Sequence, residues 1–333
     1  MKKTLLALAL LGTFGYASAQ SAITIYGSFD AGVRNLTNVD AAGNDRLTMG
    51  STGTSMSNRV GFKGVEDLGA GYNAHFTLES GFNSGTGALD AANTLFNRTA
   101  AVGLGSPFGS LDLGRQYTVA FKTIGVYEPI SYRFPTLTYA VPASAGVRYN
   151  NDIQYNGAFG PVTVRAEYAL GEQAGTISGA SAKAIGASYS SGAIAFGGAY
   201  TQRKPLVGGA FRDNKHFTVG GAYTAGGLRA AVGYADEEQE TATVDTTSKF
   251  AWGGLSYAIS PVVSVSGAYY QNKTETAGVS GKRDLYILAG YYSLSKRTSL
   301  YAEVDRSKFR GSLVASPAQT GQTGISVGVN HLF

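Results

Sequence analysis

The sequence contains no cysteine, so no disulfide stabilises the fold. Charged residues are scarce, at 15% of the chain, whereas soluble domains usually carry about 25%. Beyond the N-terminal segment, no apolar run approaches the roughly 18 residues that a membrane-spanning helix needs. These absences exclude a disulfide-stapled scaffold and a helical membrane protein, and they disfavour an ordinary soluble domain.

Residue patterns associated with catalysis are also missing. The three histidines, His75, His216 and His331, do not have metal-ligand spacing to one another. No zinc-protease, phosphate-binding-loop, nucleophile-elbow or dinucleotide-binding motif occurs. We therefore expect no enzyme activity, no catalytic residues, no cofactor, no metal site and no nucleic-acid partner.

The N-terminus has the three parts of a secretory signal peptide. Lys2 and Lys3 precede an apolar run from Leu5 to about Phe14, and the small residues 17–19 follow it. A positive start, a short apolar core and an A-x-A site are typical of a segment that is cleaved after export. We predict that residues 1–19 are the signal peptide and that residues 20–333 form one domain.

The chain is rich in glycine and aromatic residues, with 46 Gly, 21 Tyr and 16 Phe. Aromatic girdles are typical of membrane β-barrels. The last ten residues, 324–333, show the matching strand pattern. One face of this segment carries Ile325, Val327, Val329 and Phe333, and the other carries Ser326, Gly328 and Asn330.

This alternation recurs along nearly the whole chain and predicts sixteen strands. In residues 23–34, for example, Ile23, Ile25, Phe29 and Val33 share one face. Seven tight turns alternate with eight longer polar stretches. The longer stretches lie near 36–57, 84–96, 118–147, 172–182, 203–214, 236–248, 272–282 and 308–321.

The lipid environment allows only one arrangement of these strands. Lipid offers no hydrogen-bonding partner to a strand edge, so the sheet must close on itself. Short turns at one end and long loops at the other are typical of outer-membrane barrels. We therefore predict an all-β, 16-stranded antiparallel transmembrane β-barrel with a water-filled lumen and both termini on the periplasmic side.

Several segments, in chain order, resemble the general porins of Gram-negative outer membranes, in particular the β-proteobacterial branch that includes the neisserial porins. The most specific is Ser57–Gly69, which reads SNRVGFKGVEDLG. The other matching segments are 25–30, 95–98, 102–104, 108–109, 114–115, 148–151 and 328–333.

The resemblance implies a homotrimer of sixteen-stranded barrels in the outer membrane of a Gram-negative bacterium, surrounded by membrane lipid and lipopolysaccharide. Its function would be passive diffusion of small hydrophilic solutes. The third long loop, 118–147, would fold inward as the constriction loop, and Phe333 would be the signal for the barrel-assembly machinery. The many apolar residues of 118–147 also argue against disorder.

The resemblance places Arg59, Arg98 and Arg148 on a basic wall of the pore constriction. Strand parity adds Lys63, two pleats from Arg59 on the same face. Parity within 98–104 conflicts for Arg98, which falls on the face of Val102 and Leu104.

Two further lumen charges follow from parity, at Arg34 and Arg165, whereas the direction of Arg115 is ambiguous.

The constriction loop departs from that of enteric porins, which supplies two acids. Residues 118–147 hold one acid, Glu128, and two bases, Lys122 and Arg133. We expect the three to complete the constriction. A basic wall facing a loop without an acidic cluster gives a positive potential, which a narrow aperture focuses. We therefore predict a channel that prefers small anions.

Two alternatives remain at this point. The first is a substrate-selective anion channel for phosphate or organic acids, and the second is a secreted all-β adhesin or binding protein. The acidic run 236–240 falls in the sixth long stretch. We expect it to be a solvated loop tip, or else a site where divalent cations bridge lipopolysaccharide phosphates.

Overall fold

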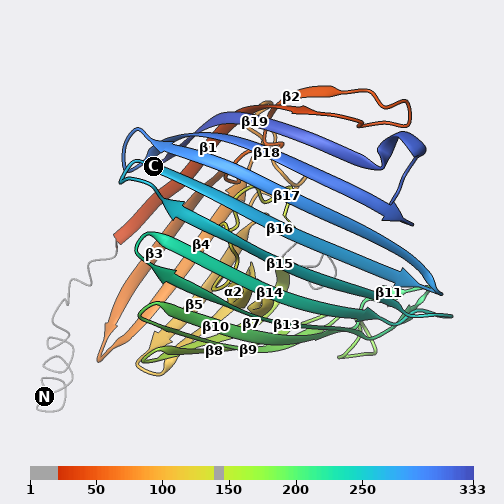
Figure 1. Ribbon diagram of the computed structural model, residues 1–333. Coiled ribbons are helices and arrows are strands. Elements are labelled where there is room, and N and C mark those ends of the chain that lie inside the picture. Colours follow the sequence, from red (N-terminus) through yellow and green to blue (C-terminus); the bar gives the residue numbers. More distant parts are fainter. Residues whose placement is uncertain (1–21, 139–145) are drawn as a thin grey trace, which may run out of the picture.

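A computed structural model of the protein describes residues 22–138 and 146–333. The predicted signal peptide lies outside these residues. Sixteen strands form a closed wall, in which each strand pairs with the next and the last pairs with the first (Figure 1). The predicted fold class is therefore confirmed.

The wall strands are β1 (Ala22–Leu36), β3 (Arg59–Gly69), β4 (Tyr72–Gly81), β5 (Thr99–Ser106), β6 (Gly109–Tyr117), β7 (Arg148–Phe159), β8 (Val162–Ala169), β9 (Ala182–Ser191), β10 (Ile194–Arg203), β13 (Asn214–Ala225), β14 (Leu228–Gln239), β15 (Thr246–Ala258), β16 (Val263–Thr276), β17 (Val279–Ser293), β18 (Thr298–Gly311) and β19 (Gly321–Leu332). The loops carry β2 (Arg46–Gly50), β11 (Leu206–Val207), β12 (Ala210–Phe211), the helix α2 (Val119–Ile124) and a 3-10 turn, η1 (Pro317–Gln319). None of the helices in the described part of the chain is long and apolar enough to cross a membrane.

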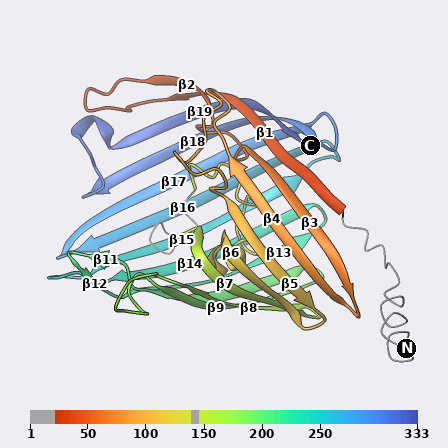
Figure 2. The ribbon, with the colours of Figure 1, turned by 180° about the vertical axis from the view of Figure 1, so that it is seen from behind.

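The barrel closes between β1 and β19. The start of β1 and the end of β19 lie at the same end of the molecule (Figure 2). The backbones of Gly27 and Phe333 exchange two hydrogen bonds, of 3.0 and 3.2 Å. The Phe333 ring lies directly over Gly27, where an added methyl group would come within 2.3 Å of the ring. Phe333 thus extends the seam where β1 and β19 close the sheet.

The two faces of the wall differ in polarity as the period-two pattern predicts. On β1, Ile23, Ile25, Phe29 and Val33 are 41–68% exposed on the outer face, whereas the polar side chains of Ser28, Asp30 and Arg34 are buried on the inner face. Outward apolar side chains form the band that faces lipid in a membrane barrel.

All seven predicted tight turns join consecutive strands, but two predicted loops are wrong. β16 and β17 run on until only Ala277 and Gly278 separate them, so 272–282 is a hairpin. β14 likewise continues to Gln239 and includes most of the acidic run. Beyond the lipid band both faces of a strand meet water, so the apolar alternation fades while backbone pairing continues.

The acidic run is therefore not a loop tip. Glu237 is buried on the inner face and accepts a hydrogen bond of 2.7 Å from Asn214. Within 22–138 and 146–333, no cluster of three or more His, Asp or Glu side chains could hold a metal ion.

The third long loop folds into the barrel, as predicted. Helix α2 contacts the inner faces of β8, β9, β10 and β13. Several apolar side chains of this loop are fully buried against the wall, including Val119, Ile124, Tyr127 and Phe134. Ile124, Tyr127 and Phe134 pack with Trp252, Tyr270, Leu285, Tyr291 and Tyr301 from the wall strands. Val119 packs separately, with Ala184 of β9 and Ala199 of β10. This packing holds the loop across the lumen.

The close packing of Phe333 on Gly27 predicts that a methyl group added at Gly27 destabilises the barrel, whereas one added at an uncrowded glycine does not. Gly27→Ala forces the Phe333 ring away and should destabilise the barrel by about 1–3 kcal/mol. Gly290→Ala, on the same outer surface, adds a methyl group that meets no atom within 4 Å and should be nearly neutral. Urea unfolding in lipid vesicles, followed by tryptophan fluorescence and by heat-modifiable electrophoretic mobility, measures both. Equal midpoints for the two variants would contradict the tight seam.

Candidate functional site

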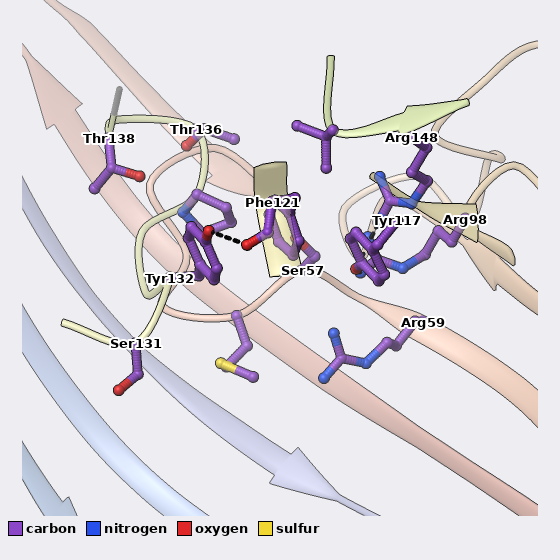
Figure 3. A pocket seen from close by; sticks show the side chains of 13 residues that line it. Ser57, Arg59, Arg98, Tyr117, Phe121, Ser131, Tyr132, Thr136, Thr138 and Arg148 are labelled. Atoms are coloured by element: carbon purple, nitrogen blue, oxygen red, sulfur yellow. Dashed lines mark hydrogen bonds between the residues drawn. The ribbon is translucent and has the colours of Figure 1, made fainter. Parts of the chain in front are cut away.

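A cavity of about 530 Å³ lies between the inner wall and the inward loop (Figure 3). We call it the arginine cavity. Its lining residues are Met56, Ser57, Arg59, Arg98, Tyr117, Phe121, Ser131, Tyr132, Pro135, Thr136, Thr138, Val147 and Arg148. Three of the seven residues predicted to form the constriction therefore meet in one place.

The three arginines converge because of strand direction. Arg59 is the first residue of β3 and Arg148 the first of β7, and β5 begins one residue after Arg98. Alternate strands of an antiparallel wall run the same way, so these starting points share one edge. The parity conflict for Arg98 disappears because this residue precedes its strand, and its side chain turns inward to Glu79.

Two carboxylates partly neutralise this cluster. Glu79 accepts a hydrogen bond of 2.6 Å from Nε of Arg98, and its other oxygen lies 3.7 Å from Nε of Arg59. Tyr26 also donates to Glu79, at 3.0 Å. Asp90 lies near Arg98 and Arg148 as well. Three guanidinium groups thus stand against the buried Glu79 and the more exposed Asp90, and the cluster keeps a net positive charge.

An aromatic stack links the wall to the loop. The guanidinium of Arg148 lies 4.2 Å from the ring centre of Tyr117, which stacks at 4.4 Å on Phe121, which stacks at 4.2 Å on Tyr132. The Tyr117 hydroxyl accepts hydrogen bonds from Arg98 and Arg148, at 2.8 and 2.6 Å. Tyr132 donates to the backbone carbonyl of Phe121 at 2.7 Å, closing the loop on itself.

No sequence pattern marks Tyr117 or Phe121 as residues of the site. Both are aromatic residues in a stretch rich in them, so composition alone does not separate them from core residues. Cation–π contact and ring stacking at these distances stabilise such an arrangement.

Glu128, the one acid of the loop, does not line the arginine cavity. Its side chain is fully buried and accepts hydrogen bonds from the Tyr270 hydroxyl and from the backbone N–H groups of Ile130 and Tyr132. Arg229 donates to the Glu128 carbonyl at 3.0 Å. Burial raises the pKa of the Glu128 carboxyl, and the donated hydrogen bonds oppose that rise. Its role here is to anchor the loop to the wall.

The other three predicted constriction residues lie away from this cavity. Lys122 donates to Gln154 of β7 and lines a separate cavity of about 340 Å³ with His75 and Asp112. Burial lowers the pKa of Lys122.

Arg133 lies over the ring of Tyr291, with 3.8 Å between its guanidinium carbon and the ring centre. Lys63 lies over the ring of Tyr26 at 5.4 Å. Neither side chain reaches the arginine cavity.

Arg34 and Arg165 both lie on the inner face, but Arg34 is not a solvated lumen charge. It is 2% exposed and contacts Asp305 at 2.7 Å and Glu303 at 3.3 Å. Arg165 is half-buried on β8, on the same face as Glu167.

Arg115 sits at an irregularity in β6 and pairs in register with Ala100, on the same face as the exposed Val102. It therefore faces outward, where it donates to the Asn97 carbonyl at 2.6 Å and to the Asn150 side chain at 2.5 Å.

Comparison with known proteins agrees with this geometry. A family model described as Gram-negative porin matches residues 5–312. An outer membrane porin of Bordetella pertussis is 29% identical, and outer membrane porin protein 32 of Delftia acidovorans is 31% identical, each over the full length of both chains. An anion-selective porin from Comamonas acidovorans, 27% identical, superposes with a TM-score of 0.83 over 94% of this chain and 100% of its own.

These relatives are porins, which are channels and not enzymes. The match also overturns the alternative of a secreted adhesin or binding protein. With a closed sixteen-stranded wall, an outward apolar band and a family match over nearly its whole length, the chain belongs to the Gram-negative porin family and is a passive channel of the outer membrane.

Proposed function

We propose that this porin conducts small hydrophilic solutes and ions with a preference for anions, and that the arginine cavity is the constriction of its pore. The observation that carries the proposal is the lining itself. Arg59, Arg98 and Arg148 point into the cavity, and no acidic residue is among the described residues that line it.

The opposing side of the cavity is neutral. The loop presents the hydroxyl groups of Ser131, Thr136 and Thr138, which can donate hydrogen bonds to a passing anion. Glu79 is engaged by Arg98 behind the lining, and Glu128 is buried elsewhere. A narrow aperture with low-dielectric walls focuses such a positive potential and enriches anions inside it.

A relative supports the same sign of selectivity. The Comamonas acidovorans porin is described as anion-selective, and it shares the fold of this chain over nearly its full length. Lys63, Lys122, Arg133 and Arg165 extend the basic character of the lumen beyond the cavity in this proposal.

A substrate-selective channel for organic acids is the second candidate. Phe121 and Tyr132 line the cavity beside the three arginines, so a carboxylate with an apolar body would meet both kinds of group. Conductance that saturates with an aromatic carboxylate but not with chloride favours this candidate.

We also propose that the chain assembles as a homotrimer and that Phe333 is read by the barrel-assembly machinery. The outward Arg115, with Asn97 and Asn150, places polar groups on a wall that otherwise exposes Leu111 and Leu113. A neighbouring subunit would cover an arginine that lipid solvates poorly.

Arg59→Ser tests the constriction with little structural cost, because Arg59 makes a longer contact to Glu79 than Arg98 does. At about 8 Å and an effective dielectric constant of about 20, one charge contributes about 2 kcal/mol to an ion in the aperture. The chloride-to-potassium permeability ratio should therefore fall by roughly thirtyfold or more at low salt, because the lost charge attracts chloride and repels potassium. The zero-current potential in a planar bilayer under a KCl gradient measures it.

Lys296→Ser is the matched control, since it removes the same charge from an exposed turn at the opposite end. It should leave the potential unchanged. A potential for Arg59→Ser equal to that of the wild type would place the constriction elsewhere.

Glu128→Gln separates loop anchoring from selectivity. A glutamine cannot accept from Tyr270 and from both backbone N–H groups at once, so the loop should lose about 1–3 kcal/mol of docking energy. We expect noisier open-channel current with an unchanged sign of selectivity. Tyr270→Phe, which removes one of the three hydrogen bonds, should give a smaller effect. A stronger anion preference without added noise would mean that Glu128 faces the aperture.

A further inference from the structure

The strand extensions beyond the lipid band carry a row of cations on the outer wall. The register pairs Lys249 of β15 with Lys273 of β16, Lys273 with Lys282 of β17, and Lys282 with Arg310 of β18. We call these four residues the basic row. Lys273, Lys282 and Arg310 lie in the parts of the chain that the sequence pattern assigns to loops, and Lys249 lies one residue beyond such a part. All four are at the end of the barrel opposite to the termini (Figure 1).

The basic row faces outward. Residues an even number of positions apart on a strand share a face. Lys282 is six residues from Leu288, and Arg310 six from Val304; both apolar side chains are exposed on the lipid-facing surface. The same spacing relates Lys249 to the exposed Leu255.

The height of the row follows from the aromatic residues below it. Tyr269 and Tyr286 are paired in register, with ring centres 5.0 Å apart, on the same outer face. Aromatic girdles mark the membrane interface of outer-membrane barrels. Lys282 lies four residues beyond Tyr286, or about 13 Å along the strand. The row therefore stands at the level of lipid head groups, on the long-loop side, which is the extracellular side in this family.

Cations outnumber acids on this surface. Arg306 and Lys308 lie below Arg310 on the same face of β18. The acids are Asp284 of β17, Glu275 of β16, and Asp236 and Glu238 of the neighbouring β14. Asp284 lies 2.7 Å from Arg310 and 3.3 Å from Lys282. The contacts of Glu275 with Lys273 and of Asp236 with Lys249 are 3.8 and 3.9 Å and partly exposed, so they contribute little.

Like charges that lie directly opposite each other in a sheet are destabilising. Lys249, Lys273 and Lys282 form two such pairs in succession, and their side chains are 57%, 51% and 35% exposed. A line of external anions would relieve this repulsion. Phosphate groups of membrane lipid are the anions fixed at this height, and ammonium groups bind them as point charges.

We propose that the basic row binds the phosphate groups of the phosphorylated lipid in the outer leaflet, with several lysines shared by one lipid head group. The row would hold a layer of lipid against β15–β18 on the outside of the wall. This surface is separate from the arginine cavity, so its role does not depend on the ion selectivity of the channel.

Binding of diphosphoryl lipid A to the intact barrel in phosphatidylcholine nanodiscs, measured by native mass spectrometry, tests the proposal. The triple variant Lys249→Gln/Lys273→Gln/Lys282→Gln should bind it more weakly. Near a membrane surface each cation contributes about fivefold, so the three together should contribute about a hundredfold. The matched control, Lys183→Gln/Lys296→Gln/Arg297→Gln, removes three charges outside the row and should bind as the wild type does.

Urea unfolding in two kinds of vesicle gives a second readout that a merely structural role would not produce. In phosphatidylcholine alone, the row variant should be more stable than the wild type, because repulsion is removed. With lipid A present, the order should reverse.

Three results would overturn the proposal: an equal loss of lipid A binding in the control variant, the same order of stability in both vesicles, or equal stabilisation of the wild type by inorganic phosphate. The last would assign the row to small free anions. Unchanged conductance of the row variant separates any failure here from failure of the proposed pore constriction.

Discussion

The structure depends on one constraint: inside lipid, every backbone N–H and C=O group needs a partner within the protein. A sheet meets this requirement only by closing, and here the closing seam joins the first and the last strands of the chain. Gly27 and Phe333 lie at the end of that seam, where their backbones add two hydrogen bonds to it. Because the first and last strands pair antiparallel, the strand number is even and the start of β1 lies at the same end of the barrel as the end of β19.

Closure around a wide lumen leaves the barrel without an ordinary core, because its apolar side chains face outward. The inward loop supplies the missing core on one side, where Tyr127, Phe134 and Ile124 pack against aromatic residues of the wall. Elsewhere the interior is held by buried polar groups, as where Arg34 meets Asp305 and Glu303. The same loop thus serves stability and permeation, and its one acid serves the former.

Sequence patterns predicted the wall well because lipid enforces polarity on alternate residues, as on β1. They failed where that pressure ends: β16 and β17 continue into water, where no polarity rule marks a strand. The three arginines of the cavity came from a resemblance, with inward parity clear for Arg59 alone. The burial of Glu128 could not be foreseen, since it depends on Tyr270 and Arg229, more than a hundred residues away in sequence.

The aromatic stack between the wall and the loop has a consequence for how such a channel can vary. Three rings in contact, Tyr117, Phe121 and Tyr132, work as a solid spacer, so the loop stands off from the wall by a distance that ring thickness fixes. In the proposed constriction, different side chains then govern the width of the pore and its ion preference: the three rings set the width and the arginines set the charge. A lineage could widen or narrow this passage by exchanging a ring while keeping its preference for one ion, or change the preference at constant width.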